Sequence, residues 1–210
     1  CCTPPPVHPL TLVACDIAGV DEVYLTGGAQ AVAAMAYGTE SMAPVEKIVG
    51  PGNRYVTAAK MMVRDTVEID FPAGPSEIAI IADEDARPDF IAADILAQSE
   101  HDPLAASMLI TPSVQLAEEV GKWITRLTAE ADRREIITQS LERSGYLIVE
   151  DLDDAVRASN RIAPEHLAIQ VRDPLSLLGK IKNAGSIFIG PYAAVACGDY
   201  ASGTNHVLPT

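Results

Sequence analysis

Short apolar runs alternate with longer segments of helical spacing along most of this chain, and glycine-rich turns separate them. The run from Ile78 to Ile81 is continuously apolar, which is typical of a parallel strand buried on both faces. Pro88 is well placed to begin the following helix, which we expect to end near Ser99. Alternation of this kind predicts an α/β fold with mostly parallel sheets.

The same patterns predict the other elements. Further strands are expected at residues 22–25, 47–49, 67–71, 106–110, 146–149, 167–171 and 186–189, and further helices at 10–18, 29–37, 55–64, 114–126, 135–143 and 152–160. The proline- and glycine-rich stretch at 72–76 is too irregular for either and marks a domain boundary near Glu77. We therefore predict two incomplete Rossmann-like units, residues 1–77 and 78–210.

Composition excludes several classes of protein. The chain has 210 residues, with 29 Asp and Glu against 15 Lys and Arg, and a net charge of −14. Such an acidic chain repels polyanions, so we expect no nucleic-acid partner. It contains no run of about 20 apolar residues that could span a membrane and no basic-then-apolar leader, so we expect neither a membrane protein nor a secreted one.

The cysteines and the chain ends carry two further expectations. Cys1, Cys2, Cys15 and Cys197 form no CxxC pair, so we expect reduced thiols in a cytoplasmic protein. The chain begins with cysteine rather than methionine and stops at Thr210, directly after a dense polar motif. We therefore expect a fragment of a longer protein.

Three of the four histidines lie in clusters of reactive residues, whereas His8 lies among prolines and is expected at the solvated surface. The first cluster ends a predicted helix, where Gln98 and His101 at positions i and i+3 share one face. Their amide oxygen and imidazole could bind one cation. Alternatively, His101 could cap the last helical turn.

The second cluster places Glu165 and His166 after the stiffening Pro164 and just before a predicted strand. The imidazole is a proton acceptor near neutral pH, and the carboxylate is a second base that could activate water. Because adjacent side chains of an extended chain point to opposite faces, one of the two could instead be structural.

The third cluster, residues 198–206, combines glycines with Asp199 and His206. Glycines permit unusual backbone angles, so this segment is either a ligand-binding loop or an ordinary turn. Together, Gln98, His101, Asp199 and His206 form a mixed nitrogen and oxygen set that suits zinc or another divalent first-row ion.

Glycine turns at residues 27–30 and 50–53 precede two predicted helices. Both lack the GxGxxG spacing and the P-loop lysine, so neither common nucleotide fingerprint is present. Each could still present a helix N-terminus to a pyrophosphate.

In chain order, the segments GGAQAVAAMAYGTE, KIVGPGN, IDFPAGPSE, AQSEHD, RIAPEHL and GDYASGTNHVLPT resemble the histidinol dehydrogenase family over nearly the whole chain. The resemblance implies an NAD-dependent, zinc-requiring homodimer that oxidises L-histidinol through the aldehyde to L-histidine, the last step of histidine biosynthesis. It also implies that both flanks of the family sequence are missing here, and that the partner's C-terminal tail completes the active site.

The resemblance assigns roles residue by residue. The catalytic acid/base pair corresponds to Glu165 and His166. Three zinc ligands correspond to Gln98, His101 and Asp199, whereas the family's fourth ligand, a histidine of the tail, has no counterpart in this sequence. The substrate contacts correspond to Ser76, Gln98, His101, Glu165, His166, Asp199 and His206. The residues that line the NAD site correspond to Gln30 and Asn53.

These roles form a coherent chemistry. Zinc can hold the amine and imidazole of histidinol, His166 can accept the hydroxyl proton, and Glu165 can activate water for the second oxidation. A rival mechanism through a cysteine thiohemiacetal would have Cys197 as its candidate, although Cys197 could simply pack as a small apolar residue.

Two other interpretations stay open. The chain could be a catalytically dead nucleotide-binding or regulatory paralogue, or part of a dehydrogenase for a different amino alcohol. The intact Glu165–His166 pair and the zinc-matching positions favour the central part of a working enzyme, because folding alone does not require that combination. We expect the isolated fragment to be inactive, since three ligands hold zinc weakly.

Overall fold

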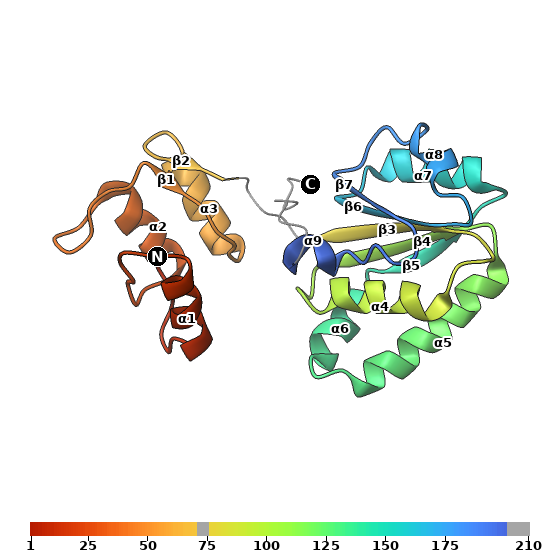
Figure 1. Ribbon diagram of the computed structural model, residues 1–210, viewed down its shortest axis with the longest axis horizontal. Helices are drawn as coiled ribbons and strands as arrows, with labels where there is room; N and C mark the ends of the chain where they lie inside the picture. The colour runs from red at the N-terminus through yellow and green to blue at the C-terminus, as the bar shows by residue number, and fades with distance from the viewer. Residues whose placement is uncertain (71–75, 201–210) are drawn as a thin grey trace. The chain divides into compact units, whose positions relative to one another are not determined.

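The structure is a computed structural model that describes residues 1–70 and 76–200, with the backbone alone for Asp199 and Tyr200. It has an α/β architecture and divides into two compact units, Cys1–Gly74 and Pro75–Thr210 (Figure 1). The division falls before Ser76 rather than after Glu77, so both residues belong to the second unit. Every pair of named strands is parallel, as the alternating pattern predicted.

The larger unit is built on a five-stranded parallel sheet of order β5-β4-β3-β6-β7. Its strands are β3 (Glu77–Ala82), β4 (Ala106–Thr111), β5 (Gly145–Ile148), β6 (His166–Gln170) and β7 (Ser186–Ile189). Counted within the unit, the order is 3-2-1-4-5, which is the order of the first five strands of a Rossmann sheet. The central pair, β3 and β6, is therefore where the strand order reverses.

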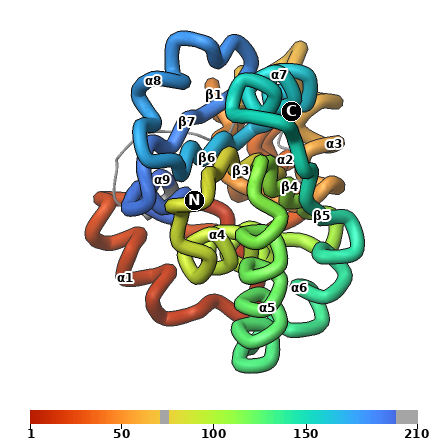
Figure 2. Tube along the Cα trace, turned by 90° about the vertical axis from the view of Figure 1, so that its right-hand side faces the viewer, coloured from red at the N-terminus to blue at the C-terminus, as the bar shows by residue number. Residues whose placement is uncertain are grey.

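Helices cover both faces of this sheet. They are α4 (Pro88–Ser99), α5 (Val114–Glu130), α6 (Arg134–Leu141), α7 (Leu152–Ile162), α8 (Leu175–Leu178) and the short α9 (Ala196–Tyr200). Figures 1 and 2 show α7 and α8 on one face and α4, α5 and α6 on the other.

The side chains of β3 explain why its sequence is continuously apolar. Ile78 and Ile80 belong to the core cluster that includes residues of α4 and α5, whereas Ala79 and Ile81 belong to the cluster that includes residues of α7. These four residues are at most 2% exposed. Successive side chains thus pack on opposite helical layers, as the sequence predicted for a strand buried on both faces.

The smaller unit combines α1 (Pro9–Ile17), α2 (Gly28–Tyr37) and α3 (Arg54–Val63) with a two-stranded parallel sheet, β1 (Lys47–Ile48) and β2 (Glu68–Ile69). Its buried core is correspondingly small and consists of Val32, Ala36, Ile48, Val63 and Val67. The side chain of Asn53 caps the N-terminus of α3 by accepting hydrogen bonds from backbone N–H groups of the first helical turn.

Two local predictions differ from the structure. The strand expected at 22–25 is wrong, because of these four residues only Tyr24 forms a bridge, to Cys2, and Leu25 is 63% exposed. The helices α8 and α9 were not predicted; with 4 and 5 residues they are too short to show a helical period. His8 is exposed as predicted, and its Nδ1 also caps α1 by accepting from the Leu10 N–H at 3.2 Å.

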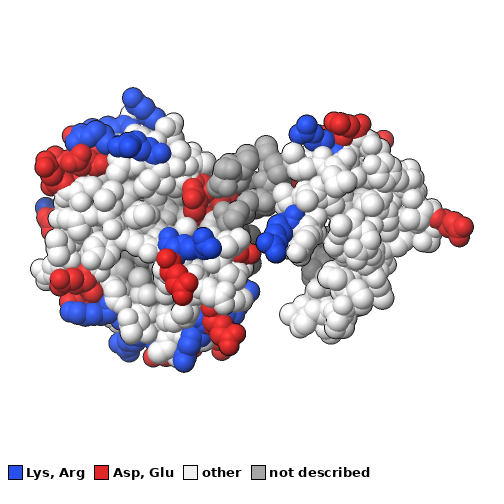
Figure 3. Space-filling view, turned by 180° about the vertical axis from the view of Figure 1, so that it is seen from behind, with Lys and Arg blue, Asp and Glu red and all other residues white. Residues whose placement is uncertain are grey.

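The surfaces of the two units differ. On the face drawn in Figure 3, charged side chains of both signs are mixed over the larger unit, whereas the smaller unit is largely uncharged. In the smaller unit, α1 exposes large apolar side chains, namely Leu10, Leu12, Val13 and Ile17. Within residues 1–70 and 76–200, no helix is both long enough and apolar enough to cross a membrane.

Candidate active site

The candidate catalytic residues meet at the amino-terminal edge of the larger sheet. β3 and β6 are neighbours, and their register pairs Ile78 with His166. Parallel strands begin at the same edge, so Ser76 and Glu77 lie beside Glu165 and His166, although 89 residues separate Ser76 from Glu165. The pairing of the two central strands thus assembles the site.

Glu165 is held by the residues that begin β3. It is 7% exposed, and its Oε2 accepts hydrogen bonds from Ser76 Oγ at 2.7 Å and from the Glu77 N–H at 3.3 Å. These two hydrogen bonds fix the orientation of the carboxylate. Burial raises the pKa of the neighbouring Glu77, and the charge of Glu165 adds to that shift, while a hydrogen bond from the Glu165 backbone opposes it.

The hydrogen bonds of His166 fix its tautomer. Its Nδ1 lies 3.1 Å from the carbonyl oxygen of Glu77. A carbonyl oxygen can only accept a hydrogen bond, so Nδ1 carries the proton and Nε2 is the proton-accepting nitrogen of the neutral ring. The alternation of side chains in an extended strand does not separate Glu165 from His166, because Glu165 precedes the strand and only His166 belongs to β6. Glu165 Oε2 lies 3.7 Å from His166 Nδ1.

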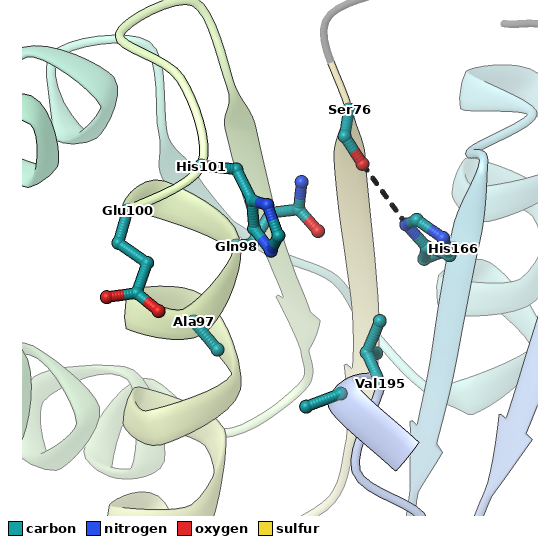
Figure 4. A pocket seen from close by; sticks show the side chains of 8 residues that line it. Ser76, Ala97, Gln98, Glu100, His101, His166 and Val195 are labelled. Carbon is teal, nitrogen blue, oxygen red and sulfur yellow. Dashed lines mark hydrogen bonds between the residues drawn. The ribbon is translucent and has the colours of Figure 1, made fainter. Parts of the chain in front are cut away.

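Ser76 and His166 line a small pocket of about 80 Å³. Figure 4 shows Gln98 and His101, at the C-terminal end of α4, on one side of it and Ser76 and His166 across from them. Because α4 runs back along the sheet from the end of β3, its last turn returns to the edge where the strands begin. Ala97, Val195 and Ala196 complete much of the lining.

Gln98 and His101 fit a bound cation. Gln98 is only 4% exposed, yet its Nε2 has no hydrogen-bond partner among the described residues. Rotating the amide by 180° places its oxygen at that position. The orientation of a glutamine amide is assigned from its hydrogen-bond partners, so both orientations are open when the nitrogen has none. A buried amide oxygen beside an imidazole is a donor pair that zinc accepts.

The other predicted ligands fall outside the described side chains. Asp199 lies in α9, whose first residue, Ala196, lines the pocket, but the side chain of Asp199 is not described. His206 lies in the undescribed segment 201–210. Among the described residues, no group of three or more His, Cys, Asp or Glu could hold a metal ion. The zinc assignment of Gln98, His101 and Asp199 stays a prediction.

The buried carboxyl group of Asp94 lies on α4, the helix that also carries Gln98. Asp94 lies one turn before Gln98 on α4, and its Oδ2 accepts from Gln170 Nε2 at 2.9 Å. Burial raises the pKa of Asp94 from 3.8 to about 6, while the hydrogen bonds from Gln170 and from the Val195 backbone oppose the shift. Asp94 therefore joins α4 to β6 and to the segment that leads into α9.

The two residues predicted at the NAD site lie in the smaller unit. Gln30 is exposed in the first turn of α2, next to Gly28, whose φ of +72° favours glycine. Asn53 Oδ1 accepts from the Tyr55 and Val56 N–H groups at 3.0 and 3.3 Å, so its side chain serves first as a helix cap. No described contact tests whether either residue binds NAD.

Comparison with known proteins decides the family. The family model described as "Histidinol dehydrogenase" matches residues 1–210. The chain belongs to the histidinol dehydrogenase family. The histidinol dehydrogenase of Methanosarcina barkeri is 58% identical over the whole chain, and that of Aquifex aeolicus is 52% identical over 98% of it. The chain spans about half the length of these curated relatives, 49% in both cases.

Solved structures agree with this assignment. The crystal structure of histidinol dehydrogenase from Elizabethkingia anophelis matches the whole chain with a TM-score of 0.94 and 39% identity, over 49% of that chain. A gamma-glutamyl phosphate reductase from Thermotoga maritima matches 90% of the chain with a TM-score of 0.51, over 51% of its own length. Its 14% identity shows a shared fold and nothing more.

Reasoning from sequence missed Glu77 as a residue of the candidate site. Its contribution comes from the backbone, whose N–H binds Glu165 and whose carbonyl oxygen binds His166, and a backbone contact leaves no residue-type signal. Cys197 is exposed, so the expectation that it packs as a small apolar residue is wrong. It is also absent from the lining of the pocket.

Proposed function

We propose that this chain is the central part of an L-histidinol dehydrogenase, which oxidises L-histidinol through the aldehyde to L-histidine with NAD as the oxidant and zinc as the metal. The observation that carries the proposal is one pocket in which Gln98 and His101 face Ser76 and His166. Metal donors and a proton acceptor converge there on a space that a small substrate would enter. Folding alone does not require such a combination.

His166 is the general base of the alcohol oxidation. Its Nδ1 proton is committed to the Glu77 carbonyl oxygen, so Nε2 accepts the proton of the substrate hydroxyl. At 4% exposure the ring is shielded from bulk water, which keeps the base oriented between turnovers.

Glu165 is the base that activates water for oxidation of the aldehyde. Ser76 and the Glu77 N–H bind Oε2 and so orient the carboxylate, which accepts a proton from the attacking water. Keeping the two bases on one short segment allows both oxidations to proceed at a single bound carbon.

Gln98, His101 and Asp199 would hold zinc, which supplies a Lewis-acidic template for the amine and imidazole nitrogens of the substrate. Gln98 presents its amide from a buried position on a rigid helix, which keeps the substrate from shifting between the two steps. Gln30, Asn53 and the neighbouring glycine turns would line the site of NAD, the hydride acceptor.

We also propose that the whole protein is a cytoplasmic homodimer in which the partner's C-terminal tail completes each active site. The four cysteines of this chain are free, which suits a reducing compartment. The sequence holds no counterpart of the family's fourth zinc ligand, so we expect the 210-residue chain to be inactive by itself.

The full-length parent enzyme provides the test. With L-histidinol as substrate, NADH absorbance and chromatography of histidine should give two NADH for each histidine. His166→Gln should lower the rate of alcohol oxidation by about 10²- to 10⁴-fold, because it removes the general base of that step. Glu165→Gln should slow aldehyde oxidation more than alcohol oxidation, which single-turnover assays started from the aldehyde can resolve.

Glu118→Gln, an exposed carboxylate on α5, is the matched control and should behave as wild type. If the full-length protein binds NAD but oxidises no amino alcohol, it is a catalytically dead paralogue and the proposal fails. Oxidation of another amino alcohol without turnover of histidinol would instead reassign the substrate.

A further inference from the structure

A partly buried ion pair in the smaller unit binds the backbone of one glycine of the second glycine turn. Lys60, on α3, is 5% exposed, and its Nζ lies 2.6 Å from Asp70 Oδ1. The same ammonium group donates to the carbonyl oxygen of Gly50. The other oxygen of Asp70, Oδ2, accepts from the Gly50 N–H at 2.8 Å. Both polar groups of one residue are therefore bound by the two members of one ion pair.

This arrangement fixes a conformation that the turn does not adopt by default. Gly50 has a φ of +130°, which side chains rarely allow, and no neighbouring atom lies within 4 Å of the place that a Cβ would occupy. A side chain would therefore have room at position 50, and it is the backbone conformation that favours glycine there. At the far end of the turn, Asn53 caps α3 and Gly52 packs so tightly on Val56 that an added Cβ would lie 2.5 Å from it.

Stability alone is a poor reason for such a pair. Removing the Lys60 ammonium and much of the Asp70 carboxylate from water costs desolvation energy that their attraction only partly returns, so an apolar pair of similar volume would stabilise the unit as well. Nor is Lys60 placed to bind a phosphate itself, because its ammonium is buried and already bound to Gly50 and Asp70. What the pair does provide is one defined position for the Gly50 peptide groups.

We propose that Lys60 and Asp70 are positioning residues that hold the turn from Gly50 to Asn53 in the shape that receives NAD. The inference rests on the proposed function, in which Asn53 lines the NAD site. The pair belongs to the smaller unit, whereas Glu165 and His166 belong to the larger one. It therefore acts on cofactor affinity and not on the chemical step.

The test is Lys60→Met in the full-length enzyme, which keeps the length of the side chain and removes its charge. We expect the Kd for NAD, from titration monitored by intrinsic fluorescence, and the KM for NAD to rise at least about tenfold. The KM for histidinol and the kcat at saturating NAD should stay within about twofold of wild type. Lys47→Met is the matched control, because Lys47 forms an exposed 3.1 Å pair with Glu68 in the same unit and touches no turn; it should leave all these constants unchanged.

Asp70→Asn is the second variant, which removes the charge of the acidic partner while keeping its shape. If Lys60→Met does not fold, as judged by circular dichroism, Asp70→Asn decides the question with the same measurements. Wild-type NAD affinity in a folded variant, or equal losses for NAD and histidinol, overturns the positioning role. Failure of the proposed function is distinguishable, because the wild-type enzyme itself would then produce no NADH from histidinol.

Discussion

Replacing Asp94 by Asn should remove a pH-dependent loss of stability from the larger unit. Asp94 is 9% exposed, and burial raises its pKa from 3.8 to about 6. A carboxyl group whose pKa is raised in the folded state favours folding fully below its unfolded pKa, and this contribution is lost as the pH rises through the folded pKa. Ionised Asp94 therefore destabilises the unit above about pH 6.

The size of the effect follows from the shift. A change of about two pKa units corresponds to about 3 kcal/mol, at ~1.36 kcal/mol per unit. The uncharged amide of Asp94→Asn should escape that cost, because Gln170 can rotate its own amide to offer Oε1, a buried atom without a hydrogen-bond partner among the described residues. The oxygen of the introduced amide then remains to accept from the Val195 backbone.

Urea unfolding between about pH 4 and pH 8 measures this difference. Trp123 is the single tryptophan, and it packs against the core of the larger unit, so its fluorescence reports on that unit. The free energy of unfolding of Asp94→Asn minus that of wild type should rise by about 2.5 kcal/mol across this range, because Asp94 is already partly ionised in the unfolded chain at about pH 4. Asp153→Asn should show the opposite sign, because Lys180 lowers the pKa of exposed Asp153 and its contribution is lost as the pH falls.

A constant difference between Asp94→Asn and wild type at every pH would refute the reasoning. It would mean that Asp94 ionises as easily in the folded chain as in the unfolded one, and that water or a counter-charge reaches it. The hydrogen bonds from Gln170 and Val195 would then cancel the effect of burial on the pKa of Asp94. In the structure, burial is the larger of the two effects.

Three further outcomes are expected. Ser76→Ala should lower kcat of the full-length enzyme about tenfold with the KM for NAD unchanged, measured by steady-state kinetics, because Glu165 loses its closest donor. Gly52→Ala should lower the stability of the smaller unit by about 1–3 kcal/mol in thermal unfolding, because the new Cβ would lie 2.5 Å from Val56. Gln98→Ala should reduce the zinc retained after dialysis, measured by elemental analysis, while a site that does not use the Gln98 amide would keep its metal.

The fold was predictable from sequence where burial is two-sided. The continuous apolar run of β3 has no other use in a chain of this length, because each of its side chains must meet a helical layer. Residues 22–25 carry similar residue types, yet Leu25 stays exposed and Tyr24 forms only one bridge. Propensity alone does not make a strand when no neighbouring strand supplies the ladder.

The site was predictable only as a set of residue types. Glu165 and His166 were recognisable as a pair. Their contact with Ser76 depends on which strand pairs with β6, and local sequence patterns do not predict a pairing between residues 89 positions apart. Glu77 could not be predicted from its residue type. Its backbone N–H and carbonyl oxygen make the contacts with Glu165 and His166, and any residue other than proline could supply both groups.

The position of the site shows why fold alone would have misplaced it. In open parallel sheets ligands usually bind beyond the carboxyl ends of the strands, where the strand order reverses. Here the order also reverses between β3 and β6, yet Ser76 precedes β3 and His166 opens β6, at the amino ends. That edge receives the last turn of α4 as well, so Gln98 and His101 arrive there from the returning helix. Two strand beginnings and one helix end therefore converge, and the proposed site lies at the edge opposite to the one that the Rossmann rule favours.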